Sequence, residues 1–120
     1  MVTFCEAIAR QEGWLVPSSR CRRNHNPGNI EYGGWAVAHG AIASDGRFAI
    51  FPDDATGFAA MSALLMTDYV GLSVQDAVAK WAPPTENDTA EYVCNVCTWT
   101  QLTPETSLTS SLLLPPLINT

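Results

Sequence analysis

The sequence predicts a single α+β domain that is mainly α, with a small antiparallel β-hairpin region. Helix-capping patterns precede apolar runs at several places along the 120 residues. Residues 24–51 are instead rich in glycine, β-branched and aromatic residues, which favours a turn and short strands. A chain of this length supports one modest hydrophobic core. We expect a domain over residues 1–103 and a Ser-, Thr-, Leu- and Pro-rich tail over residues 104–120, either docked or loose.

The first half of the chain contains one predicted helix and then the β-region. Thr3-Phe4-Cys5-Glu6 has the spacing of a capping box, so a helix is expected to begin there and run to Gln11 or Glu12. Gly13 is expected to end it, because glycine readily adopts the left-handed conformation found after helices. Short strands are expected around residues 30–37 and 48–51.

Three further capping patterns predict helices in the second half of the chain. The expected caps are Asp53 or Asp54, then Ser73, then Asp88. The corresponding helices are expected to run through about Tyr69, to the residue before Pro83, and through Cys97.

Composition and charge exclude several classes of partner. Hydrophobic residues make up 47% and charged residues 15% of the chain, which is typical of a globular protein. Twelve acidic residues against six basic ones give a net charge of −6, which disfavours binding to nucleic acid or anionic membranes. No apolar run approaches the ~20 residues of a membrane span, and Glu6 and Arg10 make the start unlike a signal peptide. We expect a monomer.

The four cysteines of this small chain favour structural disulfides. Three pairings are possible, and our preference ties Cys94 and Cys97 to Cys5 and Cys21. The alternative is that Cys94-Asn95-Val96-Cys97 forms a redox or metal-binding pair. A zinc site would need two more ligands, and His25 and His39 lack the necessary spacing, so no metal is expected.

Glu12 is the most informative residue of the first predicted helix. Phe4, Ile8 and Glu12 follow one another at intervals of four residues and therefore share one helix face. A carboxyl group that continues an apolar stripe loses hydration, which disfavours its charged form and suits a general acid. The alternative is that Glu12, in the last turn, reaches solvent past Gly13.

Four segments resemble the lysozyme-like superfamily: "AIARQEGW", "RRNHNPGNI", "GRFAIFPDDATGFAAMSALL" and "KWAPPTENDTAEYV". Their order is similar to that of phage virion-associated muramidases, lytic transglycosylases and their secreted bacterial relatives, and it covers residues 7 to about 98. The resemblance implies a cleft between a helical body and a small β-region, with peptidoglycan glycan strands as the substrate. It implies that Glu12 is the catalytic acid. It also implies a secreted, extracellular, periplasmic or virion-associated location.

The resemblance places further residues on the walls of that cleft: Asn26, Asn29, Phe51, Asn87, Tyr92 and, as a stacking surface, Trp35 or Trp81. The two asparagines belong to a Pro-Gly turn and carry amides suited to acetamido groups and hydroxyls. Alternatively, they satisfy only the backbone of their own turn. Phe51 takes the place of a family glutamine, which puts a direct substrate hydrogen bond there in doubt. Trp35 is either a sugar platform or a core residue.

Asp45 is the candidate second carboxylate. It precedes the expected strand at residues 48–51, which resembles the place of the water-activating aspartate of goose-type lysozymes. Alternatively, Asp45-Gly46 is only a hairpin turn. We expect cleavage of the β-1,4 bond between N-acetylmuramic acid and N-acetylglucosamine, with hydrolysis or transglycosylation left open and no metal or organic cofactor. The rival is a non-catalytic wall-binding module.

Overall fold

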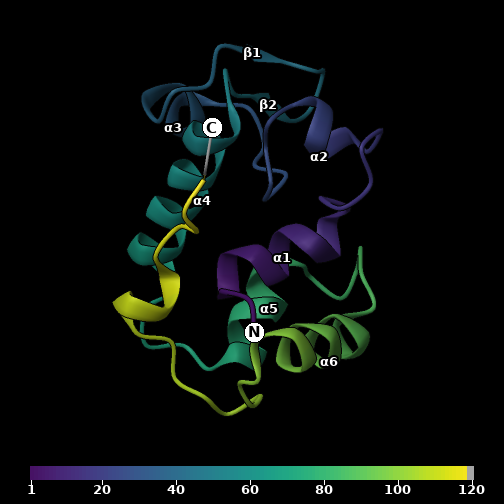
Figure 1. Cartoon of the computed structure of the whole chain (residues 1–120), viewed down its shortest axis with the longest axis vertical. Helices are drawn as coiled ribbons and strands as arrows, with labels where there is room; N and C mark the ends of the chain where they lie inside the picture. Colours follow the sequence, from purple (N-terminus) through teal and green to yellow (C-terminus); the bar gives the residue numbers. More distant parts are fainter. Residues whose placement is uncertain (119–120) are drawn as a thin grey trace.

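A computed structural model describes residues 1–118 and confirms a mainly helical α+β fold with a small antiparallel sheet (Figure 1). The elements in chain order are α1 (Phe4–Glu12), α2 (Arg20–Arg23), α3 (Gly34–Ala38), β1 (Ala43–Ser44), β2 (Ala49–Ile50), α4 (Asp54–Asp68), α5 (Val74–Trp81), α6 (Thr89–Thr100) and the 3-10 turn η1 (Ser110–Leu113). In Figure 1, α2, α3 and both strands lie at one end of the molecule, and α5 and α6 lie at the other. None of the described helices is both long enough and apolar enough to cross a membrane.

Helix α1 forms as its capping pattern predicts. The Glu6 amide donates to Thr3 Oγ1 at 3.1 Å, and the Thr3 amide donates to Glu6 Oε1 at 3.2 Å, so both bonds of the capping box are present. Gly13 ends the helix at φ 108°, a left-handed conformation that favours glycine. The buried face of α1 packs against α6 and α4, which places its last residue, Glu12, between the two ends of the molecule.

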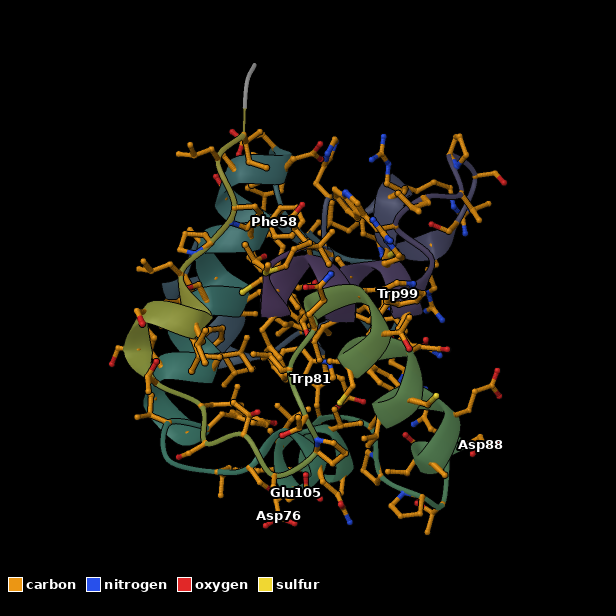
Figure 2. The ribbon with its side chains drawn as sticks, turned by 60° about the horizontal axis from the view of Figure 1, so that its bottom comes forward. Phe58, Asp76, Trp81, Asp88, Trp99 and Glu105 are labelled. Atoms are coloured by element: carbon orange, nitrogen blue, oxygen red, sulfur yellow. The ribbon has the colours of Figure 1, made fainter. Side chains whose placement is uncertain are left out.

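The caps of the later helices are also those predicted from the sequence. The side chains of Asp53, Ser73 and Asp88 accept the first free amides of α4, α5 and α6, respectively. Helix α6 runs to Thr100, three residues further than expected, and ends where Gln101 adopts φ 62°. Figure 2 shows Asp88 at the outer end of α6 and Trp81 nearer the middle of the molecule.

The β-region differs from the prediction in its first half. The strand expected around residues 30–37 is wrong, because Gly34–Ala38 forms the short helix α3 with Ala36 buried. Of that expected strand, Glu31 forms a single antiparallel bridge with Phe48. The sheet consists of β1 and β2, paired as Ala43 with Ile50 and Ser44 with Ala49. Gly33 and Gly34 interrupt the extended run, which lets the following segment close a helical turn.

The tail, whose order the sequence left open, docks on the body of the protein. The Val74 amide donates to Thr106 O at 2.9 Å, and the Leu108 amide donates to Leu72 O at 2.8 Å. Turn η1 packs on α4 and α1, where Ser62 Oγ donates to Leu113 O at 2.6 Å. Leu108 and Leu113 are fully buried, so the tail completes the hydrophobic core through residue 118.

The predicted disulfides are not formed within the described residues, and all four cysteines are free thiols. Cys5 is buried and donates from Sγ to Leu113 O, whereas Cys21 donates from Sγ to Glu12 O. Cys94 is exposed on α6, and Cys97 is partly buried one turn later. The prediction followed from composition and size, but here Cys5 and Cys21 pack as small apolar groups with backbone acceptors.

Candidate active site

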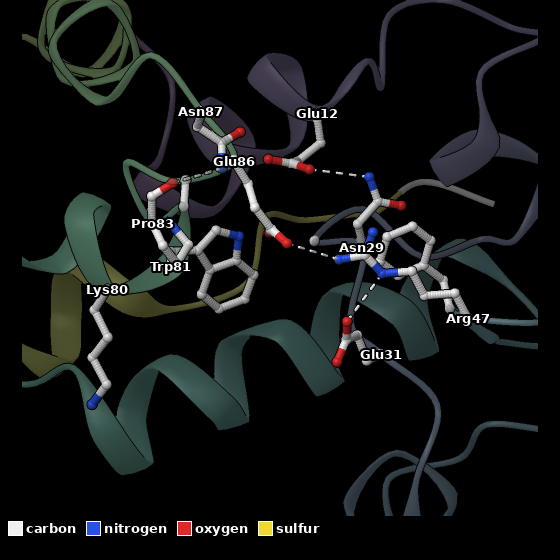
Figure 3. Close-up of a pocket in the computed structure, with 12 residues that line it drawn as sticks. Glu12, Asn29, Glu31, Arg47, Lys80, Trp81, Pro83, Glu86 and Asn87 are labelled. Carbon is white, nitrogen blue, oxygen red and sulfur yellow. Dashed lines mark hydrogen bonds and ion pairs between the residues drawn. The ribbon is translucent and has the colours of Figure 1, made fainter.

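Glu12 lines a cleft of about 550 Å³ between the helical body and the β-region. The turn at Gly28 and Asn29 lines one side of this cleft, and Phe48 contributes from the hairpin. The end of α5 and the α5–α6 loop supply another side, with Trp81 and Asn87 (Figure 3). A cavity of this volume is of the size that small-molecule and cofactor sites usually have.

Both carboxyl oxygens of Glu12 are held by neutral donors. Asn29 Nδ2 donates to Oε1 at 3.0 Å, and the Tyr92 hydroxyl donates to Oε2 at 2.9 Å. Tyr92 is only 2% exposed, and its burial, together with the Glu12 carboxylate, raises its pKa well above the ordinary value. The hydroxyl therefore keeps its proton at neutral and moderately alkaline pH. The carboxyl group of Glu12 is fixed in orientation at the surface of the cleft.

The two asparagines of the Pro-Gly turn have different roles. Asn26 is fully buried; its Oδ1 accepts from the Ile30 amide at 3.0 Å, and its Nδ2 donates to Ile30 O and Ala49 O, both at 2.9 Å. It therefore satisfies backbone groups, which was the alternative to sugar binding. Asn29 adopts φ 49° and points its amide at Glu12. Within residues 1–118 its buried Oδ1 has no hydrogen-bond partner, so the bond to Glu12 sets the orientation of the amide.

Neither Gly28, in the turn that carries Asn29, nor Gly57, on α4, has room for a side chain. A Cβ atom at Gly28 would lie 2.7 Å from Cζ2 of Trp81, and one at Gly57 on α4 would collide with the carbonyl oxygen of His25. Real Cβ contacts of this kind do not occur, so both glycines permit a close approach of the turn to its neighbours. These contacts fix Asn29 relative to Glu12.

The structure does not place Asp45 as the predicted catalytic base. Its carboxylate accepts from Arg20 Nε at 2.5 Å, from Arg20 Nη2 at 2.9 Å and from Asn24 Nδ2 at 2.8 Å. The backbone amides of Arg47 and Phe48 donate to it as well, at 3.0 and 2.7 Å. The bonds from Arg20, together with those from these amides and Asn24, hold the pKa of Asp45 well below its usual range. Asp45 ties α2 to the hairpin and, among residues 1–118, does not belong to the lining of the cleft.

Of the remaining residues that were predicted to line the cleft, some lie in it and others do not. Phe51 is fully buried in the core, so the structure corrects its placement on the wall. Asn87 lines the cleft beside Trp81, and its Nδ2 donates to Pro83 O at 3.3 Å. Trp35 is half-buried, stacks on His39 with ring centroids 3.8 Å apart, and lines an adjoining hollow of about 320 Å³ together with Trp81. Glu12, Asn29 and Asn87 therefore line one cleft, whereas Tyr92 is buried behind it and contacts Glu12.

The sequence reasoning missed four charged residues that line the cleft: Glu31, Arg47, Lys80 and Glu86. Arg47 Nε donates to Glu31 Oε1 at 3.0 Å, and Arg47 Nη2 lies 3.8 Å from Glu86 Oε1 (Figure 3). One signal was present in the sequence, namely that Glu31 follows the Asn29 turn by two residues. Arg47 is 16 residues from Glu31 and 39 residues from Glu86 in the sequence, so only the fold brings these side chains together.

Comparison of the chain with models of known protein families, and with curated proteins, gave no match. Within residues 1–118 no group of three or more His, Cys, Asp or Glu side chains is arranged to hold a metal ion.

Proposed function

We propose that this protein is a peptidoglycan-cleaving glycosidase that acts on the β-1,4 bond between N-acetylmuramic acid and N-acetylglucosamine. The observation that carries the proposal is the placement of Glu12, whose carboxyl group lines the cleft with both oxygens held by Asn29 and Tyr92. The resemblance of four sequence segments to lysozyme-like enzymes supports the choice of substrate. Those segments supply α1, the Asn29 turn, the hairpin and the α5–α6 wall, which together surround the cleft.

Glu12 acts in this proposal as the general acid. Cleavage of a glycosidic bond requires a proton on the leaving oxygen while the sugar develops oxocarbenium character. Two hydrogen bonds already fix the orientation of the Glu12 carboxyl group. Little further side-chain entropy is therefore lost when it meets the leaving oxygen. The Tyr92 hydroxyl donates a hydrogen bond to the Glu12 carboxylate, and its oxygen can accept one from the protonated carboxyl group, so it can bond to Glu12 in both protonation states.

The other residues of the cleft suit an amphipathic polymer. Trp81 offers an apolar ring surface, whereas Asn87 and the charged side chains supply hydrogen-bond partners for hydroxyl and acetamido groups. This mixture fits a glycan strand, whose sugar faces are apolar and whose edges are polar.

Glu12→Gln tests the proposal because it keeps the shape of the side chain and removes the proton donor. The measurement is the initial rate at which purified protein clears suspended peptidoglycan, with released fragments identified by mass spectrometry. We expect a fall of at least ~10²-fold, the lower end for acid–base groups, with unchanged melting and wall binding. Glu105→Gln, at an exposed position on the tail, is the charge-matched control and should match the parent.

Activity of Glu12→Gln within several-fold of the parent would contradict the assignment of the acid. A parent protein that binds peptidoglycan and releases no fragments would instead show a non-catalytic wall-binding module.

A further inference from the structure

We propose that Glu31 is the second catalytic carboxylate of this site, the base that activates water, so that the reaction is a hydrolysis with inversion at the sugar carbon. This inference rests on the proposed function. It changes the identity of the second carboxylate from Asp45 and chooses between the two reactions that the sequence left open.

Glu12 and Glu31 reach the same cleft from different parts of the fold. Glu12 ends α1, whereas Glu31 stands at the start of the β-region, where it forms a bridge with Phe48 and where the Tyr32 amide donates to Arg47 O at 2.9 Å. Figure 3 shows Glu12 bonded to Asn29 and Glu31 bonded to Arg47, with the two carboxylates apart from each other. Two carboxyl groups that face one cleft from separate elements are what an inverting glycosidase uses, with a water molecule on the opposite face of the sugar from the acid.

The ion pair with Arg47 leaves one carboxylate oxygen of Glu31 free. Arg47 Nε donates to Oε1 at 3.0 Å, which orients the carboxylate. Within the described part of the chain, Oε2 of Glu31 has no hydrogen-bond partner, and the side chain is 65% exposed. A water molecule in the cleft can therefore donate to Oε2.

Asp45, which does not line the cleft, and Glu86, which does, fit the role less well. Five donor groups already occupy the two oxygens of Asp45. Glu86 lies beyond hydrogen-bond distance of Arg47, at 3.8 Å, and its own amide bonds only to Pro83 O within the same loop. Glu31 alone among these three combines an oriented oxygen with a free one.

The proposed step transfers two protons and breaks one bond. The Glu12 carboxyl proton passes to the oxygen that joins the two sugars, and the bond between this oxygen and C1 of N-acetylmuramic acid breaks with its electron pair on the oxygen. The water oxygen bonds to C1 from the opposite face, while one water proton passes to Glu31 Oε2. The products together contain one more water than the substrate, and the new reducing end has the α configuration.

The test uses the full chain and purified peptidoglycan strands. We expect Glu31→Gln to lower the rate by ~10²–10⁴-fold with wall binding unchanged. Added azide, a nucleophile that needs no base, should restore bond cleavage in Glu31→Gln and yield an α-glycosyl azide. A residue with only a structural role would not respond in this way. Glu105→Gln again serves as the charge-matched control.

Three results would overturn the inference and leave Glu12 as the acid. They are anhydro ends in the products of the parent, a β-configured reducing end formed first, and a Glu31→Gln rate within several-fold of the parent. Loss of activity in Glu86→Gln together with retention in Glu31→Gln would transfer the role to Glu86. Failure of the parent to cleave any strand would instead overturn the proposed function itself.

Discussion

Cys5 makes part of the stability of this protein depend on pH. Its side chain is fully buried on α1, where Sγ donates to Leu113 O at 3.6 Å. Burial, assisted by the negative charge of Glu6, raises the pKa of the thiol from 9.0 to about 12. The unfolded chain therefore releases this proton above about pH 9, whereas the folded protein retains it to about pH 12. The contribution to stability is complete below pH 9 and is lost progressively between pH 9 and pH 12.

The size of the effect follows from the shift. Each pH unit between the two pKa values costs about 1.4 kcal/mol of unfolding free energy, because one proton distinguishes the two states. From pH 9 to pH 11 the loss is therefore on the order of 3 kcal/mol. This is a substantial part of the ~5–15 kcal/mol by which domains are usually stable.

Urea unfolding of the parent and of Cys5→Ala between pH 8 and pH 11, with reducing agent present, measures this loss. Burial also raises the pKa of Tyr69 and Tyr92, so both proteins should weaken at high pH. The parent should weaken more steeply, and its stability relative to Cys5→Ala should fall by the stated amount. Parallel curves for the two proteins would refute the assignment of a buried, protonated thiol at position 5.

Two further predictions concern the site and the tail. Tyr92→Phe removes the donor to Glu12 Oε2; a hydrogen bond to a charged group contributes ~1.5–3 kcal/mol, so we expect kcat to fall ~10–100-fold with little change in KM. Steady-state rates on soluble glycan strands check this, and an unchanged kcat would show that Tyr92 does not orient the acid. Leu113→Ala should lower the unfolding free energy by ~2–5 kcal/mol, because the side chain is fully buried beneath α1 and α4. A loss well under 1 kcal/mol in urea unfolding would mean that the tail is not part of the core.

The elements that the sequence predicted correctly depend on near neighbours. Thr3, Asp53, Ser73 and Asp88 each bind an amide three residues ahead, so their pattern is complete within one turn. The position of Glu12 on the buried stripe of α1 is local for the same reason. Its partner Tyr92 is 80 residues away, and only the resemblance suggested it.

The parts that the sequence did not predict depend on distant contacts. The sequence does not distinguish the roles of Asn26 and Asn29. In the structure Asn26 has a backbone role, partly because its Nδ2 donates to Ala49 O of β2. From the sequence, Asp45 could be either a turn residue or a catalytic base. In the structure the hydrogen bonds from Arg20 and Asn24 give it a structural role. Asn26 and Asp45 each have a partner more than 20 residues away, and the partner of Asn29, Glu12, is 17 residues away.

The contact between Arg47 and Glu86 has a consequence for how a polymer enters the cleft. It links the hairpin to the α5–α6 loop, and both side chains line the cleft (Figure 3). If the proposed function holds, a glycan strand laid in from the side would have to part these two side chains, whereas a free chain end could be threaded past them. Both side chains are more than half exposed, and pairs of this kind are weak and screened by salt. Ionic strength would then set the balance between trimming strands from their ends at low salt and cutting them internally at high salt.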